Sequence, residues 1–170
     1  MKIDVEYRNI LVPIDFTDTA RMAFYVALRH SRVHDADTWV IHITEPLVST
    51  DGPEAMEQTS EELQRIENGV KRRINELFEE GGLKEVDRRK VHVDFRAGDV
   101  ATEILRAIVE HDIDLVVMGH NPDQRKGLKK LLSSPPSERV VEKAPCHVLL
   151  VKPLDYTYVP DAIPEKPVRD

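Results

Sequence analysis

The sequence has few cysteine, glycine and aromatic residues, and it lacks any long apolar run. A single cysteine among 170 residues excludes an internal disulfide and is typical of a protein from the reducing cytoplasm. No apolar stretch is long enough to cross a bilayer, and the first residues do not read as a signal peptide. The net charge of −7 argues against general nucleic-acid binding, which needs a basic surface. We therefore expect a cytoplasmic protein that binds neither membranes nor nucleic acid.

The composition is that of one folded domain. Hydrophobic residues make up 41% of the chain and charged residues 32%, which favours a packed core over disorder. A length of 170 residues suits a single domain, and no internal repeat divides it. We expect the domain to cover residues 1–153 and a proline-rich tail without regular structure to cover residues 154–170.

Five short apolar runs alternate with segments of helical periodicity. The runs lie at residues 9–15, 38–43, 91–95, 115–118 and 147–151. Runs that are apolar on both faces are typical of parallel strands covered by helices. Strands that alternate with helices at these lengths predict an α/β fold, a doubly wound five-stranded parallel sheet with helices on both faces.

The helical segments are expected to bury one face each and to begin at capping residues. Asp18, with Thr17 as the rival, Asp99 and Ser134 are the expected N-caps, and Gly81-Gly82 is the expected stop of the long helix at residues 54–80. The predicted buried positions recur at helical spacing. They are Ala20, Ala23, Phe24, Ala27 and Leu28, then Leu63, Ile66, Val70, Ile74, Leu77 and Phe78, then Val100, Ile104, Leu105 and Ile108.

The stretch 114–153 carries motifs of a known family. Met118-Gly119 ends one buried run, and Ser137-Glu138-Arg139-Val140 and Ala144-Pro145-Cys146 precede the last one. These motifs resemble the universal stress proteins, of which one branch binds ATP through glycines of fixed spacing. The resemblance implies an adenine-nucleotide alpha-hydrolase-like fold with strand order 3-2-1-4-5. It also implies a homodimer through strand five, with Val148 and Leu150 at the dimer edge.

The resemblance implies a nucleotide site where the strands end, since ligands of such sheets lie beyond the carboxyl ends of the strands. The candidate residues are Pro13, Ile14, Asp15, Val40, Ile41, Met118, Gly119, His120, Ser134 and Ser137. Two of them have a structural alternative. Asp15 could simply brace the turn before the first helix, and Gly119 could be an ordinary turn glycine.

The glycine motif is degenerate in this chain. Pro122 stands where the family has its second glycine, and Ser134 followed by Pro135 stands where it has its third. Pro135 and Pro136 have no N–H, so two amide donors that could hold a phosphate at a helix start are missing. The basic residues of the preceding loop could replace these contacts, or they could form a solvated surface. They are Arg125, Lys126, Lys129 and Lys130.

These observations leave two functional hypotheses. The first is a non-catalytic stress-response binding or regulatory protein with weakened or lost nucleotide binding and a protein partner that the sequence does not name. The second is a sensor of ATP or AMP, with Mg²⁺ and at most slow hydrolysis. No metal-ligand spacing accompanies His42 and His120, so we expect hydrogen-bonded or surface histidines there, and Cys146 is expected to be a small core residue.

Overall fold

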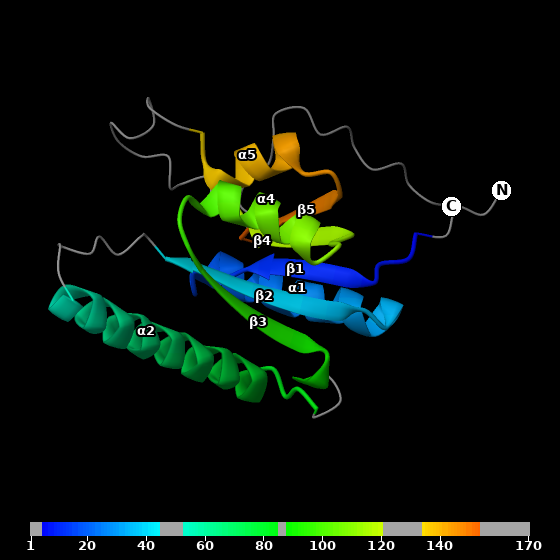
Figure 1. The fold of residues 1–170 in the computed structure, drawn as a ribbon. Helices are drawn as coiled ribbons and strands as arrows, with labels where there is room; N and C mark the ends of the chain where they lie inside the picture. The colour runs from blue at the N-terminus through cyan, green and yellow to red at the C-terminus, as the bar shows by residue number, and fades with distance from the viewer. Residues whose placement is uncertain (1–4, 45–52, 85–87, 121–133, 154–170) are drawn as a thin grey trace, which may run out of the picture.

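The computed structural model describes residues 5–44, 53–84, 88–120 and 134–153, and for residues 53–59 it describes only the course of a helix. Its centre is a sheet of five strands (Figure 1). The strands are β1 (Asn9–Pro13), β2 (Asp37–Thr44), β3 (Val91–Ala97), β4 (Leu115–Gly119) and β5 (His147–Val151). All neighbours pair in parallel in the order β3-β2-β1-β4-β5. The predicted fold class and strand order are confirmed.

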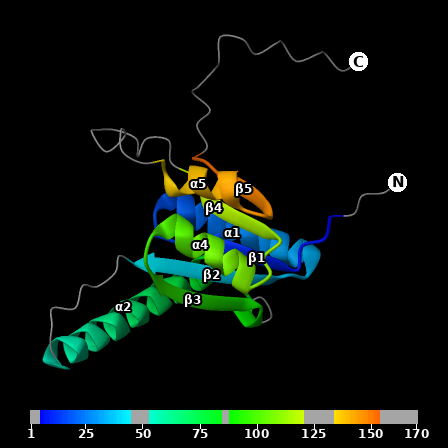
Figure 2. The ribbon, with the colours of Figure 1, turned by 45° about the horizontal axis from the view of Figure 1, so that its top comes forward.

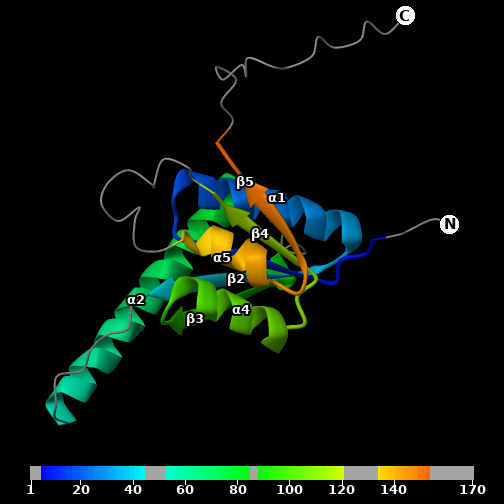
Figure 3. The same ribbon diagram turned by 90° about the horizontal axis from the view of Figure 1, so that it is seen from above.

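Helices cover both faces of the sheet, which gives three layers (Figure 3). The helices are α1 (Asp18–His34), α2 (Pro53–Glu80), α4 (Val100–Glu110) and α5 (Pro136–Lys143). One core lies under α1 and α2 and includes Val12, and the other lies under α4 and α5 and includes Leu11. Successive side chains of a strand point to opposite faces, so each strand contributes to both cores. No helix in the described part of the chain is long and apolar enough to cross a bilayer.

The predicted buried face of α1 is confirmed in full, whereas that of α2 is confirmed only in its second half. Val70 and the apolar residues after it are buried, but Ile66 is half-buried and the Leu63 residue is 38% exposed. The reason is geometric, because the first part of α2 runs beyond the sheet (Figures 1 and 2). The helix ends at Glu80, directly before Gly81-Gly82 as predicted, and Gly82 adopts a left-handed φ of 58°.

The prediction for α4 was wrong at Val100, which is 37% exposed. Ile104 and Ile108 are buried as expected, and Leu105 is half-buried against the core. Ala101 and Ala107 complete the buried face. Small side chains therefore let α4 lie close to the sheet, and the larger valine at the start of the helix faces solvent.

Two of the three predicted helix caps differ from the structure. Asp99 caps α4 as predicted, and its Oδ1 accepts a hydrogen bond from the Thr102 amide at 3.0 Å. Thr17 rather than Asp18 caps α1, because its Oγ1 accepts from the Ala20 amide at 3.3 Å. Ser134 does not cap α5; Pro135 holds that position and makes no side-chain capping bond.

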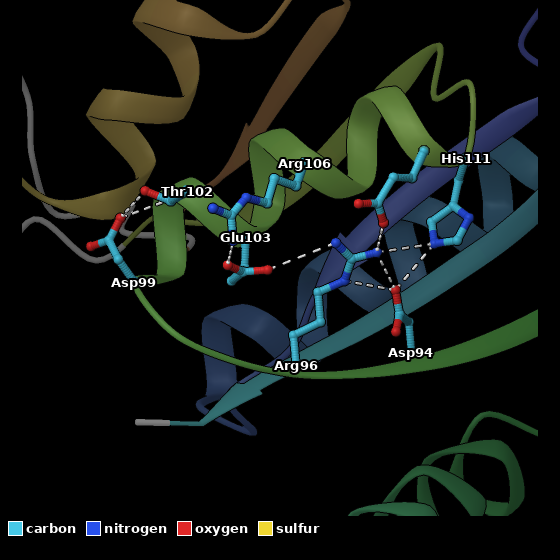
Figure 4. A network of polar contacts seen from close by, with 8 residues as sticks. Asp94, Arg96, Asp99, Thr102, Glu103, Arg106 and His111 are labelled. Carbon is cyan, nitrogen blue, oxygen red and sulfur yellow. Dashed lines mark hydrogen bonds and ion pairs between the residues drawn. The ribbon is translucent and has the colours of Figure 1, made fainter. Parts of the chain in front are cut away.

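The two edge strands carry different side chains. Edge strand β5 is apolar from Val148 to Val151. Edge strand β3 directs charged side chains toward α4, where Arg96 bonds the Asp94 carboxylate at 2.7 Å and the Glu110 carboxylate at 2.6 Å (Figure 4). His111 bonds the same Asp94 oxygen at 3.1 Å. Burial alone would raise the pKa of Asp94, but the hydrogen bonds from His111 and Arg96 outweigh burial and hold that pKa below its usual value.

Candidate functional site

The candidate site lies at the carboxyl ends of β1 and β4, which are neighbours in the centre of the sheet. The crossover from β1 runs through α1 to β2 on one side, while β4 pairs with β1 on the other. A crevice opens at such a switch point because the two connections leave in opposite directions. The structure brings the turn at Asp15 and the β4 end at Gly119 to this point, as predicted, since Gly119 lies against the first residues of α1.

The turn between β1 and α1 is fixed by hydrogen bonds from two sides. The Ile14 amide donates to the Ile41 carbonyl at 2.9 Å, and the Nδ1 of His42 lies 2.7 Å from the Ile14 carbonyl oxygen. The Oδ1 of Asp15 accepts from both the amide and the hydroxyl of Thr17, at 3.0 and 2.6 Å. The structural role considered for Asp15 is therefore present, although its Oδ2 receives no hydrogen bond from the residues that the structure describes.

Phe16 gives this turn an unusual backbone. Its φ is 62°, in the left-handed region that a bulky side chain rarely adopts. Its ring is 5.6 Å from the His42 ring and 4.0 Å from the Arg73 guanidinium of α2. These contacts hold the strained residue in place, so β2 and α2 together define the shape of the turn that carries Asp15.

Gly119 is required by the close approach of β4 to α1. A Cβ at this position would lie 2.8 Å from the Thr19 carbonyl carbon and 2.9 Å from the Ala20 nitrogen. Both are backbone atoms, and real Cβ atoms essentially never come so close. Gly119 therefore has a packing role of its own, whatever the crevice binds.

His120 and Ser137 connect β4 to α5. The His120 Nδ1 lies 3.0 Å from the Ser137 hydroxyl oxygen, and the His120 amide donates to the Val151 carbonyl at 2.8 Å. The Ser137 residue is only 6% exposed. The prediction that His120 makes hydrogen bonds is confirmed, and the pair places a hydroxyl in the first turn of α5 beside the end of β4.

The start of α5 offers few amide donors. Pro135 is the N-cap, and Pro136 is the first helical residue. The Pro135 carbonyl accepts from the amides of Glu138 and Arg139, at 3.0 and 3.2 Å. The structure thus places both prolines where a phosphate-binding helix would present free N–H groups.

The Arg139 side chain points to α4 and not along α5. Its two terminal nitrogens, Nη1 and Nη2, donate to the two carboxylate oxygens of Asp99, each at 2.8 Å. The hydrogen bond from Arg139, aided by those from Thr102, holds the pKa of Asp99 well below its usual range. The positive charge at the start of α5 is therefore balanced within the fold.

Val40 and Ile41 lie inside the paired part of β2. Both are fully buried, and each is aligned with a residue of β1 and a residue of β3. The Ile41 carbonyl already accepts from Ile14. The basic candidates Arg125, Lys126, Lys129 and Lys130 lie outside the residues that the structure describes, as does Pro122.

Metal and thiol chemistry find no support among the described residues. No group of three or more metal-ligating side chains is placed to hold an ion in that part of the chain. Cys146 is half-buried against the α4–α5 core, as predicted, and burial raises the pKa of its thiol, which disfavours the reactive thiolate.

Sequence reasoning missed how much of the site depends on His42, Phe16 and Arg73. The position of His42 near the end of a predicted strand is a usable signal for it. Nothing in the local sequence signals the left-handed Phe16 or the arginine that stacks on it from α2.

Comparison with known proteins agrees with this architecture. The sequence model of the universal stress protein family matches residues 6–152. A universal stress protein of Methanocaldococcus jannaschii is 28% identical over 148 residues, which cover 86% of this chain and 82% of that protein.

Two solved structures share the fold. A universal stress protein from Lactobacillus plantarum has a TM-score of 0.67 at 22% identity, covering 87% of this chain and 99% of that chain. Another universal stress protein, solved in complex with cAMP, has a TM-score of 0.60 at 18% identity, covering 86% of this chain and 98% of that chain.

Proposed function

The chain belongs to the universal stress protein family, and on that premise we propose that it is a cytoplasmic, non-catalytic binding protein of the stress response that holds adenine nucleotides only weakly. The proposed crevice uses the turn at Pro13, Ile14 and Asp15 and the β4–α5 side at Gly119, His120 and Ser137. Val40, Ile41, Met118 and Ser134 stay candidates for its walls. The relative in complex with cAMP supports an adenine nucleotide as the ligand class.

The single observation that supports weak nucleotide binding is the pair of prolines at the start of α5. A helix N-terminus binds phosphate through free amide groups, and here the cap and the first helical residue are both prolines. Arg139 does not compensate, because Asp99 holds its guanidinium in a bidentate ion pair. No described residue bonds the Oδ2 of Asp15, so this oxygen can accept a hydrogen bond from a ribose hydroxyl. The site therefore favours the nucleoside part of the ligand over its phosphates.

Calorimetric titration with adenosine, AMP and ATP tests this proposal. We expect the affinity of the wild type to change little along this series. The double variant Pro135→Thr and Pro136→Val restores two amides and should bind ATP at least tenfold more tightly, with adenosine unchanged. Pro145→Ala is the matched control, because Pro145 is exposed and follows α5. If the double variant gains nothing for ATP, the prolines do not limit binding and the proposal is wrong.

The alternative is a sensor of ATP or AMP with Mg²⁺ and at most slow hydrolysis. The hydroxyl of Ser137, bonded to His120 in the first turn of α5, supports it, because such a hydroxyl can donate to a phosphate bound at the helix start. Arg125, Lys126, Lys129 and Lys130 would then supply the charge that the prolines remove. Micromolar binding of ATP to the wild type, lost in Asp15→Ala, would favour this sensor.

We also propose a homodimer through β5, which is an apolar edge strand of the sheet that the structure describes. Val148 and Leu150 pack toward the α4–α5 core, whereas Leu149 is 36% exposed on the other face. Leu149→Glu should therefore disturb the dimer more selectively than a charge at either neighbour. Light scattering should report a monomer for Leu149→Glu and a dimer for the control Val109→Glu, which lies on α4 and is 70% exposed. A Leu149→Glu protein that stays dimeric would contradict the proposal.

A further inference from the structure

The hydrogen bond between His42 and Ile14 fixes the protonation pattern of the imidazole ring. The Nδ1 of His42 lies 2.7 Å from the Ile14 carbonyl oxygen. A carbonyl oxygen can only accept, so Nδ1 must carry the proton. In the neutral ring the other nitrogen, Nε2, then has a free lone pair and acts only as an acceptor. No donor among the described residues reaches this Nε2.

His42 contacts the turn that borders the proposed crevice. His42 lies two residues before β2 ends at Thr44, and it is half-buried. The residue whose carbonyl it bonds, Ile14, directly precedes Asp15. Its ring also contacts the Phe16 ring at 5.6 Å, so an aromatic surface borders the acceptor nitrogen. The neighbouring Ile41 has its backbone carbonyl occupied by the Ile14 amide. The side chain of His42 is therefore a polar group that β2 can offer to a ligand beside this turn.

Resting on the proposed function, we infer that His42 is the residue that selects the base. Its Nε2 would accept a hydrogen bond from the 6-amino group of an adenine ring. A purine with an oxygen at position 6 would instead turn a lone pair toward the lone pair of Nε2, which leaves two acceptors facing each other. The site should therefore distinguish 6-amino from 6-oxo purines although the two have nearly the same shape.

Protonation of His42 reverses this preference. Once Nε2 carries a proton, it becomes a donor that suits a 6-oxo group and opposes a 6-amino group. The charged groups around the ring are Asp15 in the adjoining turn and two cations of α2, Arg73 over Phe16 and Lys71 over Phe95, the residue aligned with His42 on β3. None of these three groups bonds Nε2, so they do not change which atom of the base it reads.

The test is to titrate the full-length protein with AMP and with IMP at about pH 7.5 and about pH 5.5, the range in which histidines change charge. The two nucleotides carry the same phosphate, so the ionisation of the phosphate cancels in the ratio of their affinities. For the wild type we expect AMP to bind at least tenfold more tightly than IMP at the higher pH, and this ratio should fall at least threefold at the lower pH. This comparison requires no variant and therefore no assumption about folding.

Variants then assign the effect to one side chain. His42→Phe keeps an aromatic ring beside Phe16 but has no ring nitrogen, so the ratio of AMP to IMP affinity should be close to one at both pH values. The control is His92→Phe. His92 lies on β3 and bonds Asp37 of β2, so this variant should leave the wild-type ratio and its pH dependence unchanged.

The outcomes separate the inference from the function on which it rests. Absence of AMP binding to the wild type overturns the nucleotide site and with it the role of His42. Binding of AMP and IMP with equal affinity, or a preference for AMP that does not change with pH, overturns only the role of His42. A His42→Phe protein that keeps the wild-type ratio would do the same.

Discussion

Gly119→Ala tests the close approach of β4 to α1, on which the shape of the crevice depends. The added methyl carbon would lie 2.8, 2.9 and 3.0 Å from three backbone atoms of Thr19 and Ala20. Non-bonded carbon atoms prefer separations of about 3.5–4.0 Å. The first turn of α1 would therefore have to move away by roughly half an ångström to one ångström, because none of these atoms belongs to a side chain that could rotate.

The cost of such an insertion can be estimated from overpacked cores. Forcing one methyl group into a well-packed site typically costs about 1–3 kcal/mol. For a domain of this size each kcal/mol lowers the melting temperature by about 2–4 °C. We thus expect Gly119→Ala to melt roughly 2–12 °C below the wild type. Gly119 does not have a positive φ, so the whole effect is steric.

The control is a glycine of the same chain with open space around it. Gly69 lies within α2, and a Cβ there would meet no heavy atom within 4 Å. Gly69→Ala should stabilise the protein by about 0.8–1 kcal/mol, because alanine is the better helix former. Urea denaturation and thermal melts of both variants measure the two effects. A Gly119→Ala protein as stable as the wild type would refute the close packing, and effects of the same sign at both positions would refute the reasoning.

Three further predictions concern other contacts. Thr17→Ala should lower the free energy of unfolding by about 1 kcal/mol in urea titrations, while Asp18→Ala should change it by only a few tenths, since Thr17 is the cap. Asp99→Asn keeps a capping side chain but removes the charge that Arg139 bonds. Because the folded pKa of Asp99 is lowered, its stabilisation is complete above about pH 5 and is lost as the pH falls below about 4, so the two melting curves should converge in acid; a constant difference would contradict this. Trp39, the only tryptophan, stacks on His111 and His92 at 3.7 and 4.6 Å between ring centroids, so His111→Leu should change its fluorescence, whereas Val109→Glu at an exposed position of α4 should leave it unchanged.

The fold was predictable because its signals are repeated and local. Each buried strand is a short apolar run, and Gly81-Gly82 and Asp99 mark helix ends through their own chemistry. The errors arose where a neighbour in space decides. Leu63 has the spacing of a core residue, but no sheet lies beneath it, and Val100 is exposed because Ala101 fits the narrow space instead.

The places of the candidate residues in the fold were predictable, but their contacts were not. Asp15, Gly119 and His120 follow strand ends, and parallel strands finish at one edge of a sheet. Local sequence did not reveal that Arg139 bonds Asp99, 40 positions away, or that Arg73 stacks on Phe16. Such partners are set by the packing of helices that are distant in sequence.

The unlike edges of the sheet limit how far the protein can assemble. Strand β3 turns Asp94 and Arg96 inward to a charged network with α4, and inward-pointing charges on an edge strand discourage pairing with another chain. If two copies join through β5, the outer boundaries of the combined sheet are both β3. A symmetric pair of this kind is closed, because each subunit uses its only adhesive edge. In such a pair, growth into filaments would require β3 to lose these charges, so Asp94 and Arg96 would limit further pairing as well as brace the fold.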